Sequence, residues 1–181
     1  MNNLTFLTHL TFNDYFNYPL TDSLSNLSSL THLTFGFNFN QPLNESLSNL
    51  SSLTQLTFGW NFNQPLSNSL NNLSSLTHLT LDCNFKQSLE IPFNIKILTL
   101  NCNNINLIEN LPNSIEELNF GYNFDLELNN LPNSIKIIRF NKSSYYNKEL
   151  NNLPKHLEIL ELPEKYNINL TNINPDCKII K

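Results

Sequence analysis

The chain has 181 residues, a net charge of −5 at pH 7, and only one arginine among its ten basic residues. No basic stripe is available to neutralise phosphates, which argues against nucleic acid as a partner. No apolar run reaches the length of a membrane-spanning helix and no secretory signal is visible, so we expect no membrane partner and a cytoplasmic protein.

A block of the form Leu-x-x-Leu-x-Phe/Leu returns along the chain every 19 to 23 residues. A period in the low twenties is typical of leucine-rich repeats, in which each copy stacks on the next. The repeats predict a single solenoid over residues 1–181, with a change of repeat subtype near residue 90. The nine blocks are 7–12, 30–35, 53–58, 76–81, 95–100, 115–120, 135–140, 157–162 and 177–181.

Each block predicts a short strand. In the second block Leu33 and Phe35 alternate with His32 and Thr34, which is the period of two of a strand. Stacked copies would form a parallel sheet, with strands about 4.8 Å apart. The predicted fold is therefore a mostly β solenoid of the α/β type, a leucine-rich-repeat horseshoe with a parallel sheet of about nine short strands and few or short helices. The side chains predicted to be buried include those of Leu33, Phe35, Leu56 and Phe58.

An asparagine follows three residues after the last apolar residue of many blocks, as at Asn38, Asn61, Asn84, Asn103 and Asn123. A side-chain amide carries donors and an acceptor, so it can pair turn backbone that would otherwise be unsatisfied. Asn61→Ala is therefore expected to destabilise the fold, and Asn68→Ala, on a return segment, to be nearly silent. An aromatic residue comes next in most repeats, and these rings are predicted to form an internal ladder.

The return segments change near residue 90. In the first half, at 23–30, 46–53 and 69–76, leucines lie three apart among Ser and Asn, which favours short helical or 3₁₀ turns. Any helix is expected to be confined to these segments. In the second half Leu-Pro-Asn-Ser-Ile, at 111–115 and 131–135, favours an extended return.

Two stretches of the first half are similar to the FNIP repeat. They are 30–43 and 53–66, each with Leu-Thr-x-Leu-Thr-Phe-Gly followed by Phe-Asn-Gln-Pro-Leu. The chain thus resembles FNIP-repeat proteins, a leucine-rich-repeat subtype of social amoebae and of giant viruses that infect amoebae. If the chain is viral, its expected place is the host cytoplasm. The likeness is strongest for residues 4–90 and weaker to about 170. Some viral members carry an F-box for a ubiquitin ligase, which has no counterpart in these residues.

The outward side chains of the strands are predicted to form an open face for a protein partner. The partner-binding residues predicted there are His9, His32, Thr34, Phe37, Gln55, Thr57, Trp60, His78, Thr80 and Tyr122. Phe37 and Trp60 are the expected anchors, because exposed neighbouring aromatics are typical of interfaces. The alternative is that both fold over the rim and cover the core. Cys83 and Cys102 share their row and are expected to be reduced thiols.

No catalytic, cofactor or metal site is predicted, because the sequence does not bring three or four ligands together. The chain is therefore expected not to be an enzyme. Three other functions stay open: a structural or self-associating element that makes contacts through uncapped ends, the substrate-recognition part of a larger ubiquitin-ligase adaptor, and, as the weakest, a hydrolase or transferase.

Overall fold

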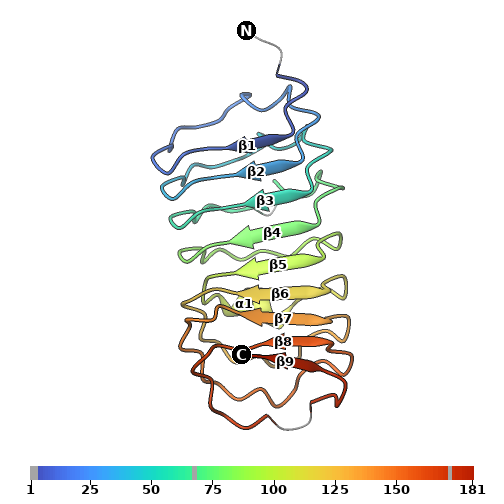
Figure 1. Ribbon diagram of the computed structural model, residues 1–181. Helices are drawn as coiled ribbons and strands as arrows, with labels where there is room; N and C mark the ends of the chain where they lie inside the picture. The colour runs from blue at the N-terminus through green and yellow to red at the C-terminus, as the bar shows by residue number, and fades with distance from the viewer. Residues whose placement is uncertain (1–3, 67–68, 171–172) are drawn as a thin grey trace.

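The computed structural model describes residues 4–66, 69–170 and 173–181. In these residues nine short strands form one parallel sheet, in which each strand lies beside the next one along the chain (Figure 1). This confirms the predicted solenoid. The strands are β1 (His9–Thr11), β2 (His32–Thr34), β3 (Gln55–Thr57), β4 (His78–Leu81), β5 (Ile97–Leu100), β6 (Glu117–Phe120), β7 (Ile137–Phe140), β8 (Ile159–Glu161) and β9 (Lys178–Ile180).

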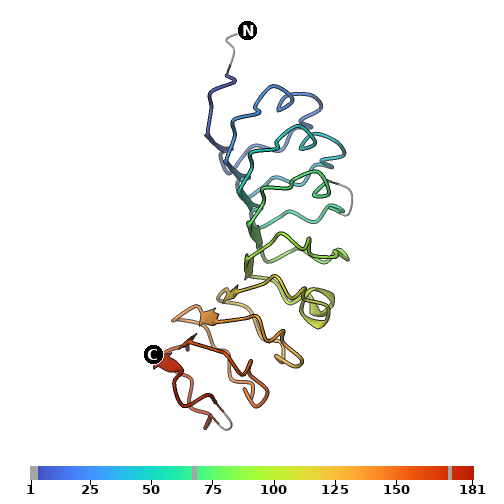
Figure 2. The same ribbon diagram turned by 90° about the vertical axis from the view of Figure 1, so that its right-hand side faces the viewer.

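The sheet lines the concave side of the molecule. Figure 2 shows the strands along the inner side of a bowed stack of coils, with the return segments on the opposite side. The register aligns equivalent residues of consecutive repeats, so that Leu33 faces Leu10 on one side and Leu56 on the other. Every row of repeat-equivalent side chains therefore runs as a continuous line across the strands.

The core consists of the inward side chains of the strands and of an aromatic ladder beside them. Leu33, Phe35, Leu56 and Phe58 are at most 1% exposed, which confirms the predicted alternation. Rings at the ladder position stack from repeat to repeat, with centroids 6.0 Å apart between Phe39 and Phe62 and 6.2 Å apart between Phe62 and Phe85. The ladder resumes at Phe124, Tyr146 and Tyr166.

The fifth repeat breaks the ladder, because the ladder position holds Asn104 instead of an aromatic residue. Asn104 is buried, and its amide donates to the carbonyl of Gln87 at 2.9 Å. The short helix α1 (Ile105–Glu109) follows, and it buries Leu107 and Ile108. In the seventh repeat two extra residues separate the strand residue Phe140 from the ladder residue Tyr146. The centroids of these two rings lie 4.3 Å apart.

The prediction that helix is confined to the Ser-Leu-rich returns is wrong. Those segments are turns, each closed by a hydrogen bond from a backbone N–H to the carbonyl three residues earlier. Examples are the bonds from Leu27 to Leu24 and from Leu30 to Leu27, both at 3.0 Å. The α-helix lies instead in the fifth return, where Leu107 and Ile108 fill the core. Within the described residues no helix is long and apolar enough to cross a membrane.

The predicted role of the turn asparagines is only partly correct. Asn61 donates to the side chain of Asn38 at 3.0 Å and accepts from that of Asn84 at 3.2 Å, so these amides pair with each other. A second amide row, two residues further on, satisfies the backbone. Its member Asn40 accepts from the N–H of Asn63 at 2.9 Å, and the row is made of Asn17, Asn40 and Asn63.

Candidate functional site

The first four repeats present the predicted binding rows on the concave face. The register places His9, His32, Gln55 and His78 in one row and Thr11, Thr34, Thr57 and Thr80 in the next. All of these side chains are exposed or half-buried. The surface is therefore polar, with small or planar groups that can make hydrogen bonds.

Threonine hydroxyls determine which ring nitrogen carries the proton in neutral His32 and His78. The hydroxyl of Thr31 donates to the carbonyl of Thr8 at 2.9 Å, so it must accept in its 2.8 Å contact with Nδ1 of His32. His78 meets Thr77 in the same way, at 2.8 Å. The neutral rings therefore carry the proton on Nδ1, which leaves Nε2 as a hydrogen-bond acceptor.

His9 and His32 stack face to face, with centroids 4.0 Å apart and planes 12° from parallel. Burial lowers the pKa of His32, and the neighbouring His9 and His78 lower it further, since two adjacent imidazolium rings would repel each other. His32 therefore favours its neutral state, in which Nε2 can accept a hydrogen bond.

Phe37 and Trp60 lie just past β2 and β3, where they form an exposed aromatic pair. Their rings are 5.7 Å apart and 9° from parallel, and the residues are 46% and 38% exposed. Neither residue belongs to the buried core, so the alternative that both close over it is not what the fold adopts.

Tyr122 lies apart from this pair, because Cys83 and Cys102 occupy the two repeats between them. It is 48% exposed and meets Tyr145 edge to face, with centroids 5.9 Å apart. The amino group of Lys165 lies 4.9 Å from the centre of the Tyr145 ring, a cation–π contact. The structure thus joins Tyr122 to a second aromatic cluster of its own.

The placement of Cys102 in the open row is wrong. It is 2% exposed and is part of the core, at the repeat where Asn104 interrupts the aromatic ladder. Burial raises the pKa of its thiol to about 11. Cys83 remains half-buried at the surface, and all three cysteines are free thiols.

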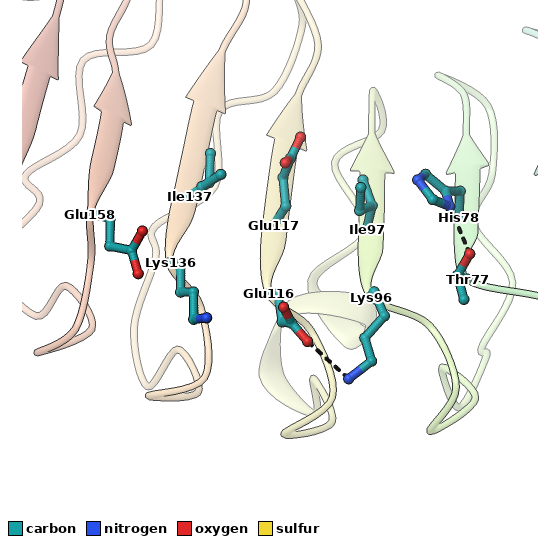
Figure 3. Close-up of a pocket in the computed structure, with 9 residues that line it drawn as sticks. All are labelled: Thr77, His78, Lys96, Ile97, Glu116, Glu117, Lys136, Ile137 and Glu158. Atoms are coloured by element: carbon teal, nitrogen blue, oxygen red, sulfur yellow. Dashed lines mark hydrogen bonds and ion pairs between the residues drawn. The ribbon is translucent and has the colours of Figure 1, made fainter.

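The second half of the concave face contains a shallow groove that the sequence did not predict. It extends from β4 to the residues just before β8, with a volume of about 380 Å³ (Figure 3). Its apolar members are Ile97 and Ile137, at the strand position that carries His or Gln in the first four repeats. The change from polar to apolar residues at this strand position is the feature of the sequence that could have indicated the groove. The groove is lined by Thr77, His78, Lys96, Ile97, Glu116, Glu117, Lys136, Ile137 and Glu158.

Charges alternate along one margin of this groove. Lys96 and Glu116 form an ion pair at 2.9 Å, and Lys96 is the main cause of the lowered pKa of Glu116. In the next row of the sheet Arg139 bridges Glu117 and Glu161. These pairs are partly exposed, so each contributes little to stability, on the order of 0–1 kcal/mol, but together they fix the pattern of charge that a ligand would meet.

Within the described residues no group of three His, Cys, Asp or Glu side chains is placed to hold a metal ion. The arrangement offers hydrogen-bonding groups, aromatic faces and fixed charges along an extended surface.

The FNIP repeat model matches residues 103–143 and 122–165. Both matched stretches lie in the second half of the chain, whereas the sequence resemblance rested mainly on residues 4–90. No curated protein matches the chain.

Among solved structures the chain is similar to CroV588, described as a novel circular LRR protein structure. The two share 28% identity with a TM-score of 0.67, and the match covers 97% of this chain. This chain spans about one third of the length of that protein, since the match covers 33% of it. The protein is thus a solenoid of the leucine-rich-repeat type.

Proposed function

We propose that this chain is a non-enzymatic protein-binding module that binds its partner on the concave face and on the aromatic pair of Phe37 and Trp60 beside it. The exposed pair of Phe37 and Trp60 carries this proposal, because large aromatic side chains that lie open beside small polar residues are typical anchors of interfaces. The aligned His, Gln and Thr rows supply hydrogen-bonding groups next to the anchors. Solenoids of this kind generally use such extended faces for binding.

The test is Trp60→Ala in a pull-down from an amoebal lysate, the source that the family resemblance implies. Loss of a central aromatic anchor costs about 2 kcal/mol or more of binding, so capture of the partner should be lost while the melting temperature changes little. Phe93→Ala is the matched control. Phe93 is 84% exposed and lies on a return segment, so its loss should leave capture unchanged. If Trp60→Ala unfolds the protein, or if both variants lose capture equally, the proposal fails.

A second candidate function is self-association into a larger assembly. It is favoured by the match to a protein described as circular, of which this chain covers 33%. Copies joined head to tail could then complete an arc of repeats. Size-exclusion chromatography with light scattering tests this candidate directly. A mass of 20.9 kDa at all concentrations would exclude it, and a discrete multiple of that mass would support it.

A further inference from the structure

Asp14, Phe37, Trp60 and Cys83 lie side by side in four consecutive repeats. Backbone hydrogen bonds fix this row. The N–H of Asn38 donates to the carbonyl of Asp14 and that of Asn61 to the carbonyl of Phe37, both at 2.9 Å. The same bond follows from Asn84 to Trp60, at 3.2 Å. The residue after Trp60 in the row is therefore Cys83.

Trp60 is 38% exposed. One face of its indole stacks on Phe37, with near-parallel planes, so the other face is turned toward the fourth repeat. There the row continues with the small side chain of Cys83, and no other ring of the described residues contacts Trp60. The aromatic stack therefore ends at Trp60, because the next position of the row holds a small side chain instead of a ring.

A carboxylate lies at this end of the stack. Asp82 precedes Cys83 and accepts a hydrogen bond from the backbone N–H of Cys83 at 2.7 Å. Asp82 forms no ion pair with any described residue. At the far side of the aromatic pair Asp14 accepts from the N–H of Phe37 at 3.1 Å. Each end of the pair is thus flanked by a negative charge.

The surroundings also favour a cation. Residues 4–91 contain five carboxylates and a single lysine, Lys86. The histidines of the neighbouring concave face present Nε2 acceptors, because the threonine hydroxyls hold the ring protons on Nδ1. A ligand that offers positive charge and several N–H donors would complement both features.

We propose that the face of Trp60 turned away from Phe37, with Asp82 beside it, binds an arginine side chain of the partner protein. The guanidinium is planar, so it can continue the aromatic stack while its edge donates to the carboxylate. Lysine suits this place less well, because its ammonium has no flat face. The inference rests on the proposed function, since it names the group that the Trp60 anchor recognises.

Trp60 is the only tryptophan in the chain, so its emission reports directly on this place. The probe is a short arginine-containing peptide, compared with the same peptide carrying citrulline, which keeps the shape and loses the charge. The arginine peptide should change Trp60 emission saturably, and the citrulline and lysine peptides should bind at least several-fold more weakly. Equal binding of arginine and citrulline peptides, or no binding of the arginine peptide, overturns the proposal.

Asp82→Asn separates a specific contact from general attraction. Asparagine keeps an acceptor for the N–H of Cys83, so the turn should stay intact while affinity for the arginine peptide falls at least about threefold. Asp22→Asn removes the same charge on an exposed return segment and should leave affinity unchanged. An equal loss in both variants overturns the proposal. Partner capture that needs Trp60 but not Asp82 would sink this inference and leave the proposed function standing.

Discussion

The pKa of His32 depends on the histidines that other repeats place in the same row. The same residue type recurs one repeat away at His9, and the parallel register brings the two rings to 4.0 Å. Burial and the adjacent histidines lower the pKa of His32, so the unfolded chain binds this proton more readily than the folded one. The stability contributed by neutral His32 is complete above the usual histidine pKa of about 6.5 and decreases as the pH falls below it.

His32→Gln, which copies the residue at Gln55, should therefore reduce the loss of stability on acidification. The measurement is the melting temperature at about pH 7.5 and about pH 5.5, where the drop should be smaller in the variant than in the original protein. His156→Gln, an exposed site outside the row, serves as control and should leave the drop unchanged. The same drop in all three proteins would contradict the assignment.

At the scale of the element, two amide rows hold each turn against the next. The Asn38–Asn61–Asn84 row links side chains to each other. The Asn40–Asn63 row accepts from backbone N–H groups and also from glutamine side chains, as in the 3.2 Å contact of Gln87 with Asn63. The second row contributes more to stability, because a backbone N–H that loses its partner cannot rotate toward solvent as a side chain can.

Asn63→Ala should consequently cost about 1–3 kcal/mol of unfolding free energy, since it removes the acceptor of two hydrogen bonds, from the backbone N–H of Lys86 and from the side chain of Gln87. Asn61→Ala should cost less, about 1 kcal/mol, because its partners are side chains that can turn to solvent. Asn68 lies outside the described residues, so Asn72, which is exposed on a return segment, is the matched control. Urea unfolding measures all three, and an Asn72→Ala cost equal to that of Asn63→Ala would refute the role of the row.

For the whole molecule, stability is transmitted from repeat to repeat through the core ladder. The core contacts of each repeat are made with its neighbours, so no central core compensates for a local defect. Phe62 stacks on Phe39, Phe58 and Phe85, and it is 1% exposed. A cavity at this place weakens two repeat interfaces at once.

Phe62→Ala should cost about 3–5 kcal/mol, as for other large core truncations, whereas Phe93→Ala should be nearly neutral. The check is chemical denaturation followed by circular dichroism. Because repeat arrays can lose cooperativity, a broadened or two-step transition is also expected for Phe62→Ala. A single transition with an unchanged midpoint would show that the ladder is not required.

The candidate site was predictable where it follows from the strand period. The outward positions of His32, Gln55 and Thr57 are set by alternation, and Phe37 and Trp60 fall outside the leucine pattern. The groove beside Ile97 and Ile137 was not predicted, because its hollow depends on the bow of the sheet and on side chains from five consecutive repeats. Local spacing carries no information on that curvature.

The sequence by itself determined the parallel solenoid, its strand positions and the leucine and phenylalanine core, because a short amphipathic period repeated nine times can bury its apolar face only by stacking. Only the tertiary structure decided which amides pair with backbone, why Cys102 turns inward and where helix α1 forms. Each of these depends on the space and the hydrogen-bonding groups that the adjacent repeat offers. Those come from residues about 20 positions away in the chain, and they act only once the coils have stacked.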